Sequence, residues 1–145
     1  MTQEQKELLK DLCARLPYEV KCDIEFDDGK VFHKRILMPI MIQDLKSCES
    51  LKAIKPYLFP LSSMTEEQRI ELYKVLGWGY ESHYHLSKEW EDFNESIDNN
   101  GLFLPASWVS ELNKMYNWLN KNHFDYRGLI KKSLALDATN LGIYE

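Results

Sequence analysis

The chain has 145 residues, of which 44% are hydrophobic and 28% charged, and its formal net charge is −5. This size and composition are typical of one globular domain and exclude a chain that is disordered throughout, so we predict a single domain over 1–145 without a separable linker. The negative charge argues against nucleic acid as a partner, because non-specific binding depends on Lys and Arg that neutralise phosphates.

The N-terminal segment predicts a helix that ends at Pro17. Thr2 and Gln5 have the spacing of a capping box, in which each side chain bonds a backbone N–H at the helix start. Apolar residues then recur at helical spacing and predict a buried stripe. The stripe comprises Leu8, Leu9, Leu12, Cys13 and Leu16. We expect Cys13 to be a small core residue and not a nucleophile.

Residues 19–42 predict a hairpin whose turn lies at 27–29, because apolar and polar residues alternate in its first strand. A two-residue turn at 28–29 would place Ile24 opposite His33. We prefer a three-residue loop with Gly29 in a left-handed bulge, because it keeps the apolar residues of both strands on one face. That face would comprise Val20, Cys22, Ile24, Phe32, Ile36 and Met38, with Lys34 as a misfit.

Two extended segments are expected after the hairpin. Ile40 and Ile42 follow Pro39 and would begin a third short strand. Farther along, two prolines bracket the apolar residues of 55–63. A flexible linker would not carry so many apolar residues, so this segment is expected to lie extended across the core.

Three further helices are expected in the second half. Thr65 and Gln68 repeat the capping-box spacing, Ser87 can cap a helix that runs through Ile97, and Pro105 fits the first turn of a fourth helix. Their inward residues would be Ile70, Tyr73, Leu76, Trp90, Phe93, Ile97, Trp108, Val109, Leu112, Met115, Tyr116 and Leu119. This order of elements predicts an α+β protein, with about four helices packed on a small antiparallel sheet formed by the hairpin.

The cysteines and the absence of apolar segments indicate the compartment. Three widely spaced cysteines form no CxxC motif, and the first residues lack the basic and then apolar pattern of a secretory signal. No apolar run approaches the ~20 residues of a membrane span. We therefore expect reduced thiols, cytoplasmic localisation and no association with membranes.

Four blocks of sequence stand out together. They run from Leu12 to Tyr18, from Lys55 to Glu67, from Trp118 to Ile130 and from Leu134 to Leu136. With these blocks the chain resembles a group of short uncharacterised proteins of Bacteroides-type gut bacteria and their phages or prophages. The resemblance implies a whole-chain domain, a cytoplasmic setting and a mobile-element origin, and it implies no activity. The group is expected to carry glycine where this chain has Glu19.

One spacing is typical of a metal site. His83 and His85 flank Tyr84, so in an extended segment their imidazoles and the Glu81 carboxylate would share a face. Zinc or iron would need a further ligand from elsewhere, such as His123 or Asp125. We favour two partly exposed histidines in an aromatic loop, and we predict no metal and no other cofactor.

His123, Asp125 and Arg127 alternate and would share one face of an extended segment. The histidine with the carboxylate could act as a general base, and Arg127 could hold an anion. We favour a structural role, in which His123 ends a helix, Asp125 pairs with Arg127 or caps a turn, and Gly128 takes a positive φ. No catalytic residue is predicted. The alternative function is a small hydrolase or metal-dependent enzyme that uses His83, His85, His123 and Asp125.

Four aromatic residues lie in or beside a segment interrupted by glycines. They are Trp78, Tyr80, Tyr84 and Trp90. Aromatic side chains recur as anchors of protein interfaces, although these four could equally cover the core. We predict a small non-enzymatic interaction protein that binds another protein through this region, with Arg127 as a further binding residue.

Overall fold

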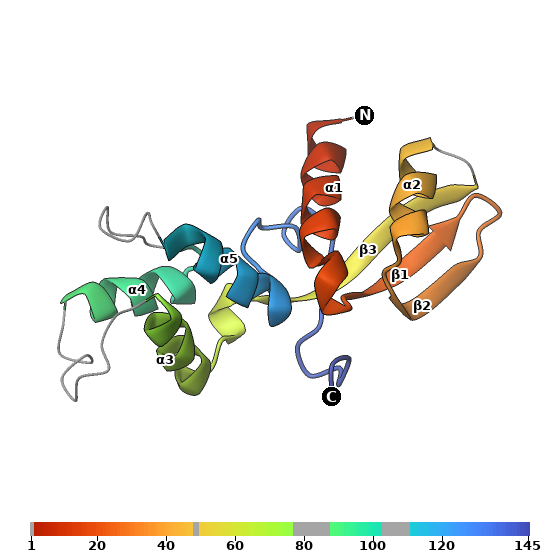
Figure 1. Ribbon diagram of the computed structural model, residues 1–145. Coiled ribbons are helices and arrows are strands. Elements are labelled where there is room, and N and C mark those ends of the chain that lie inside the picture. Colours follow the sequence, from red (N-terminus) through yellow and green to blue (C-terminus); the bar gives the residue numbers. More distant parts are fainter. Residues whose placement is uncertain (1, 48–49, 77–87, 103–110) are drawn as a thin grey trace. The chain divides into compact units, whose positions relative to one another are not determined.

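A computed structural model describes residues 2–47, 50–76, 88–102 and 111–145 (Figure 1). The chain divides into two compact units, one formed by Met1–Leu58 with Arg127–Glu145 and the other by Phe59–Tyr126. The described part combines α-helices with a mixed β-sheet, so the predicted α+β class is confirmed. The single domain over 1–145 stays a prediction. No helix in these residues is long and apolar enough to cross a membrane.

The first helix, α1 (Gln3–Arg15), begins at the predicted capping box. The Thr2 hydroxyl accepts a 3.1 Å hydrogen bond from the Gln5 amide, and the Gln5 side chain accepts a 2.8 Å hydrogen bond from the Thr2 amide. A 3₁₀ turn that contains Pro17 follows, and Glu19 then takes a left-handed conformation with φ of 55°. Glycine adopts this conformation most readily, because it has no Cβ.

Our prediction that Cys13 is a core residue is wrong, because the inward face of α1 includes two charged residues. Cys13 is exposed, whereas Asp11 and Arg15 are fully buried beside Leu8 and Leu12. The spacing of these four residues is that of one helix face. A search for apolar residues at helical spacing does not find such a face. Asp11 and Arg15 can be buried there because their opposite charges pair with each other.

The hairpin consists of β1 (Lys21–Phe26) and β2 (Val31–Ile36), which pair antiparallel. The Phe26 amide donates a 2.9 Å hydrogen bond to the Lys30 carbonyl, and Gly29 has φ of 88°. The predicted three-residue loop with a left-handed glycine is therefore confirmed. Ile24 lies opposite Phe32, as that loop requires.

The second half of the hairpin departs from the predicted register. Lys34 has φ of 57°, and the pairing shifts between Cys22 and Ile24. Ile36 consequently lies opposite Lys21 and is 47% exposed, so its predicted place on the buried face is wrong. The extra residue of a β-bulge reverses which face the following side chains occupy. Met38, predicted on the same face, is also exposed.

A helix replaces the predicted third strand. Pro39 opens α2 (Pro39–Ser47), in which Ile42 is buried and Ile40 is exposed. Proline suits the first turn of a helix because the N–H that it lacks has no partner there. The prediction of a strand at Ile40 and Ile42 is therefore wrong.

The predicted extended segment is the C-terminal half of β3 (Leu51–Pro60), which begins four residues earlier than expected. A 3₁₀ turn (Leu61–Ser63) follows it. β3 pairs antiparallel with β1, so the strand order is β2-β1-β3. Its last residues pair in parallel with β5 (Leu136–Asp137) and β4 (Phe124–Asp125). The sheet is therefore mixed, not purely antiparallel as predicted.

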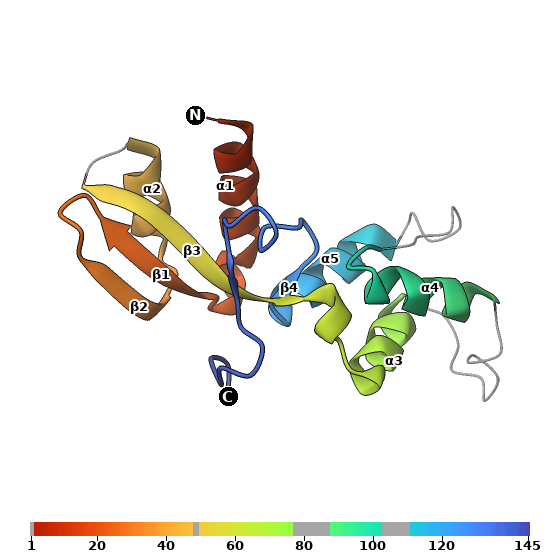
Figure 2. The same ribbon diagram turned by 180° about the vertical axis from the view of Figure 1, so that it is seen from behind.

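In the first unit, α1 and α2 lie on one side of the three long strands, as Figures 1 and 2 show from opposite directions. Buried side chains of both helices and of the facing side of β1 and β3 form its core. The core includes Leu8, Leu9, Leu12, Val20, Cys22, Ile24, Leu37, Ile42, Leu51, Ile54, Leu58, Leu129 and Ala135. Gly128 takes the predicted positive φ, at 71°, and Leu129 directly after it enters this core.

The second unit contains α3 (Glu66–Val75), α4 (Lys88–Asp98) and α5 (Leu112–Lys121). Thr65 and Gln68 form the second predicted capping box. The core of this unit comprises Leu61, Met64, Leu72, Tyr73, Leu76, Trp90, Phe93, Ile97, Met115, Trp118, Leu119 and Phe124. Predictions for Ser87, Pro105, Trp108 and Val109 lie outside the described residues.

Candidate functional site

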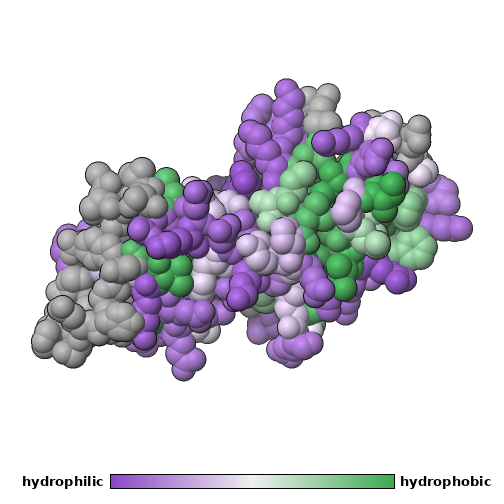
Figure 3. All heavy atoms as spheres, viewed as in Figure 1, coloured by the Kyte–Doolittle hydropathy of each residue, from purple (hydrophilic) through white to green (hydrophobic). Residues whose placement is uncertain are grey.

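A pocket of about 300 Å³ opens in the first unit between α1 and α2, above β3. We call it the α1–α2 pocket. Figure 3 shows hydrophobic residues reaching the surface in this part of the first unit. The lining residues are Gln5, Leu8, Leu9, Leu45, Lys46, Lys52, Ala53, Ile54, Lys55 and Leu134. This volume is at the lower end of the range for ligand pockets.

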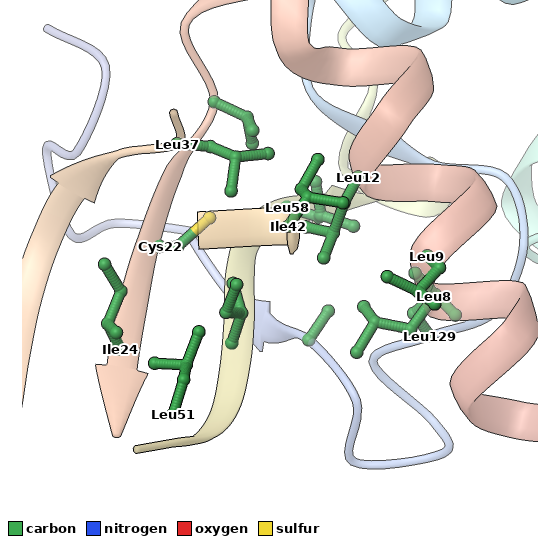
Figure 4. Packing of buried hydrophobic residues seen from close by; sticks show 13 residues of the cluster. Leu8, Leu9, Leu12, Cys22, Ile24, Leu37, Ile42, Leu51, Leu58 and Leu129 are labelled. Atoms are coloured by element: carbon green, nitrogen blue, oxygen red, sulfur yellow. The ribbon is translucent and has the colours of Figure 1, made fainter. Parts of the chain in front are cut away.

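Each wall of the pocket has an identifiable origin. The capping box fixes the start of α1, from which Leu8 and Leu9 project toward the sheet near Leu129 (Figure 4). Leu45 comes from the last turns of α2, and Leu134 follows the turn at Gly128. The pocket therefore depends on three segments that are distant in sequence.

The floor of the pocket is the edge of β3 and not its face. Side chains of a strand alternate between the two faces of a sheet, so four consecutive residues can line one pocket only at the edge of the strand. Lys52, Ala53, Ile54 and Lys55 are such a run. In the described residues, the strands on this side pair with β3 only from Tyr57 onward.

The backbone of Ile54 points to this open edge. Farther along the same edge, the Leu58 carbonyl accepts a 2.8 Å hydrogen bond from the Ala138 amide. Backbone groups of alternate residues point to the same side of a strand, so those of Ile54 and Pro56 share the direction of Leu58. Pro56 has no N–H and Ile54 is fully buried, so neither residue presents an accessible donor to the pocket.

The rim of the pocket is positively charged, although the whole chain is negative. Lys46, Lys52 and Lys55 line it, and no carboxylate does so among the residues described. Lys52 also lies 3.2 Å from Glu25, whereas Lys46 and Lys55 form no ion pair within the described part of the chain. The pocket thus combines an apolar lining with a cationic rim.

The predicted aromatic site is described only at Trp90. This side chain is 7% exposed and packs edge-on against Tyr73, with ring centroids 5.0 Å apart. It therefore belongs to the core of the second unit and presents little surface for binding. Trp78, Tyr80 and Tyr84 lie outside the described residues.

The groups predicted for the alternative enzyme are also described only in part. His83 and His85 lie outside the described residues. His123 has φ of 63° and directly precedes β4, in which Asp125 is buried. The described residues contain no group of three or more His, Cys, Asp or Glu placed to hold a metal ion.

Arg127, predicted as a binding residue, pairs with a carboxylate of α1. Its Nε lies 3.3 Å from Oδ1 of Asp11, and Nε of Arg15 lies 2.7 Å from Oδ2 of the same residue. One buried carboxylate thus contacts two guanidinium groups. The arrangement ties α1 to the C-terminal segment of the first unit.

A second carboxylate joins all three long strands, and sequence reasoning missed it. Asp23 of β1 accepts a 2.6 Å hydrogen bond from the Tyr57 hydroxyl and lies 2.8 Å from Nδ1 of His33. Burial alone would raise the pKa of Asp23, but hydrogen bonds from Tyr57, His33 and the Lys34 amide outweigh it and lower the pKa. The alternation of β1 could have placed Asp23 on the face opposite the core, but not beside Tyr57.

The α1–α2 pocket was not predicted from sequence. One of its walls belongs to α2, where we expected a strand, and Leu134 lies 80 residues after Ile54. The signal in the sequence is the run Lys52-Ala53-Ile54-Lys55, in which two lysines enclose two apolar residues. Such a run is typical of a protected strand edge, and it does not specify a binding site.

Comparisons with known proteins give no relative. No family model, no curated protein and no solved structure matches the chain. The function proposed below is therefore inferred from the geometry of the molecule alone.

Proposed function

We propose that this chain is a small non-enzymatic interaction protein that binds an apolar, acidic segment of another protein in the α1–α2 pocket. The observation that supports the proposal is the combination of an apolar lining with three lysines, in a chain whose net charge is −5. A cationic rim attracts an acidic partner and orients it on encounter. The apolar lining then favours burial of its side chains.

The pocket is large enough for a useful affinity. Each leucine-sized side chain that it buries contributes about 1.5–3 kcal/mol before the costs of association. Two such side chains contribute about 3–6 kcal/mol before those costs, so even with contacts to the lysines we expect weak binding, with Kd above 1 μM (about −8 kcal/mol). Affinities of this order suit a reversible interaction.

The experiment is a selection of random dodecapeptides on the folded protein by messenger-RNA display. We expect enriched peptides that contain apolar residues with Asp or Glu. Leu45→Asp should weaken their binding at least tenfold, because it places a carboxylate in the apolar lining. Leu141→Asp is the matched control, since Leu141 is exposed and does not line the pocket.

Charge reversal at the rim supplies a second variant that should not perturb the core. Lys46→Glu and Lys55→Glu alter exposed side chains and should weaken binding of the selected peptide, most strongly at low salt. Lys131→Glu, at an exposed position outside the pocket, should leave it unchanged. The proposal fails if no peptide is enriched, or if binding is insensitive to Leu45→Asp and to both rim variants.

Binding through the aromatic region 78–90 stays a prediction, and the same peptide tests it. Trp78→Ala and Tyr84→Ala should leave binding unchanged if the pocket is the site. Loss of binding in these two variants, with retention in Leu45→Asp, would move the site to the aromatic region. The enzyme that uses His83, His85, His123 and Asp125 also stays a prediction.

A further inference from the structure

We infer that the segment bound in the α1–α2 pocket is an amphipathic helix, with its apolar face in the pocket and acidic residues on its flanks. This inference rests on the proposed function and specifies the kind of partner. A helix that lays its apolar face in a groove is a recurring mode of peptide recognition. Three features of the pocket favour a helix: the polar groups near its floor, the origin of its apolar walls and the charge of its rim.

The pocket offers few polar partners to the backbone of a bound segment. Pro56 has no N–H, and Ile54 is fully buried. Gln5 already accepts a hydrogen bond from the Thr2 amide, and no carboxylate lines the pocket among the described residues. N–H groups of an extended segment that turn toward the pocket would therefore meet no free side-chain acceptor. A helix needs none there, because it bonds its own N–H and C=O groups.

The apolar walls of the pocket also suit a helix. Leu8 and Leu9 come from α1 and Leu45 from α2, and these helices lie on the same side of the sheet (Figure 1). Side chains on the surface of a helix form ridges, and a further helix packs its own ridges into the grooves between them. A helix also brings residues three and four positions apart together on one face. A compact pair of apolar side chains fits a pocket of about 300 Å³ better than a row of them.

The charge of the rim sets the polar residues of the partner helix. Lys46, Lys52 and Lys55 surround the apolar lining, and all three are exposed. Side chains that flank the apolar face of a bound helix would lie next to this rim. Asp or Glu at those positions would form charge-assisted hydrogen bonds with the lysines, whereas Lys or Arg would be repelled. The partner helix is therefore acidic on its flanks.

A second copy of this chain does not supply such a helix from its described residues. The nearest match is α4, which carries Glu91 and Glu95 on its exposed side. Its apolar residues Trp90, Phe93 and Ile97 are buried in the core of the second unit. They could reach a pocket on another molecule only if that unit unfolded. The acidic amphipathic helix is therefore assigned to a different protein.

The test uses the most enriched dodecapeptide from the selection. An alanine scan first locates positions whose side chains do not contribute to binding. Proline is then placed at one such position in the middle of the peptide, where it breaks a helix, and separately at the first residue, where a helix tolerates it. We expect at least tenfold weaker binding for the central proline and little change for the other. Alanine at the same central position is the matched control.

A covalent link between two non-contributing positions four residues apart gives the opposite perturbation. It holds the peptide in a helix before binding, so we expect at least threefold tighter binding. An extended segment could not bind with this link in place, since its ends would be drawn together. The Cα chemical shifts of a carbon-13-labelled peptide supply an independent readout, because they move in opposite directions in helices and strands.

The outcomes separate the helix from the proposed function. Helix-type shifts in the complex, with the expected effects of the proline and the link, support the helix. Binding that is lost in Leu45→Asp, but shows strand-type shifts or is weakened by the link, overturns the helix and leaves the proposed function intact. Absence of any peptide sensitive to Leu45→Asp or to the rim variants overturns the proposed function itself.

Discussion

Nε of Arg15 donates a 2.7 Å hydrogen bond to Oδ2 of Asp11 one helical turn away, and neither side chain is exposed to solvent. Arg127 approaches the other oxygen of the same carboxylate. Taking charges out of water is costly, and the cost is offset only while each charge keeps its partner. A single substitution in the Asp11–Arg15 pair is therefore expected to lower the stability of the fold strongly.

We expect Asp11→Ala to lower the free energy of unfolding by about 3–5 kcal/mol, because it leaves the buried Arg15 guanidinium without its carboxylate. Urea denaturation followed by circular dichroism measures the loss. Asp92→Ala is the matched control, since Asp92 pairs with Lys88 at the same spacing on an exposed helix surface. An equal effect of the two substitutions would show that water reaches the Asp11 pair.

Glu19→Gly should stabilise the protein by about 0.5–1 kcal/mol. Glu19 has φ of 55° and ψ of 42°, a conformation that costs a residue with a Cβ about 1–2 kcal/mol and glycine much less. The greater freedom of glycine in the unfolded chain removes part of this gain. Thermal unfolding gives the comparison, and Glu19→Ala, which keeps the Cβ, should give no increase in Tm.

Stability in acid should depend on Asp23. Its pKa in the folded protein is lowered, so its contribution is fully present above the ordinary carboxyl pKa of about 3.9 and is lost as the pH falls toward the folded-state value. Tyr57→Phe removes the 2.6 Å hydrogen bond and should raise the pKa of Asp23, with a loss of about 1 kcal/mol at neutral pH.

An NMR titration of the Asp23 carboxyl carbon measures this shift directly. Tyr126→Phe is the control, because it removes a tyrosine hydroxyl that bonds Asn120 in the second unit. It should leave the titration of Asp23 unchanged. A titration of Asp23 that is unaltered by Tyr57→Phe would assign the lowered pKa to His33 and the backbone.

Gly128→Ala should cost about 1–2 kcal/mol through backbone strain alone. Gly128 has φ of 71°, and a Cβ added there would meet no atom within 4 Å. A Cβ at Gly101 would lie 3.5 Å from the Ser96 carbonyl, an ordinary contact, so Gly101→Ala should be close to neutral. The two variants, compared by urea denaturation, separate conformational strain from steric contact.

Patterns formed by residues close in sequence were sufficient to predict part of the fold. Both capping boxes depend on two residues three positions apart, and the hairpin loop depends on the positive φ that Gly29 allows. The positive φ of Gly128 follows from the same kind of signal. Each of these was predicted because the interacting groups are close in sequence.

The predictions that proved wrong concern features that depend on contacts between residues distant in the sequence. Asp11 is buried because Arg15 and Arg127 neutralise it, and the second arginine lies more than one hundred residues away. The bulge at Lys34 reversed the face of Ile36, which no alternation pattern could show. The α1–α2 pocket needs α2 and Leu134 together, so its existence could not be predicted from any single stretch.

The arrangement of the two units along the chain has a consequence for synthesis. The second unit is the uninterrupted stretch Phe59–Tyr126, whereas the first is completed only by Arg127–Glu145. During translation all residues of the second unit have been made before Leu129 is added. Leu129 is part of the core of the first unit. The first unit, which holds the pocket, is therefore completed only after the second unit has been made, and a nascent chain truncated before Arg127 would lack the Leu134 wall.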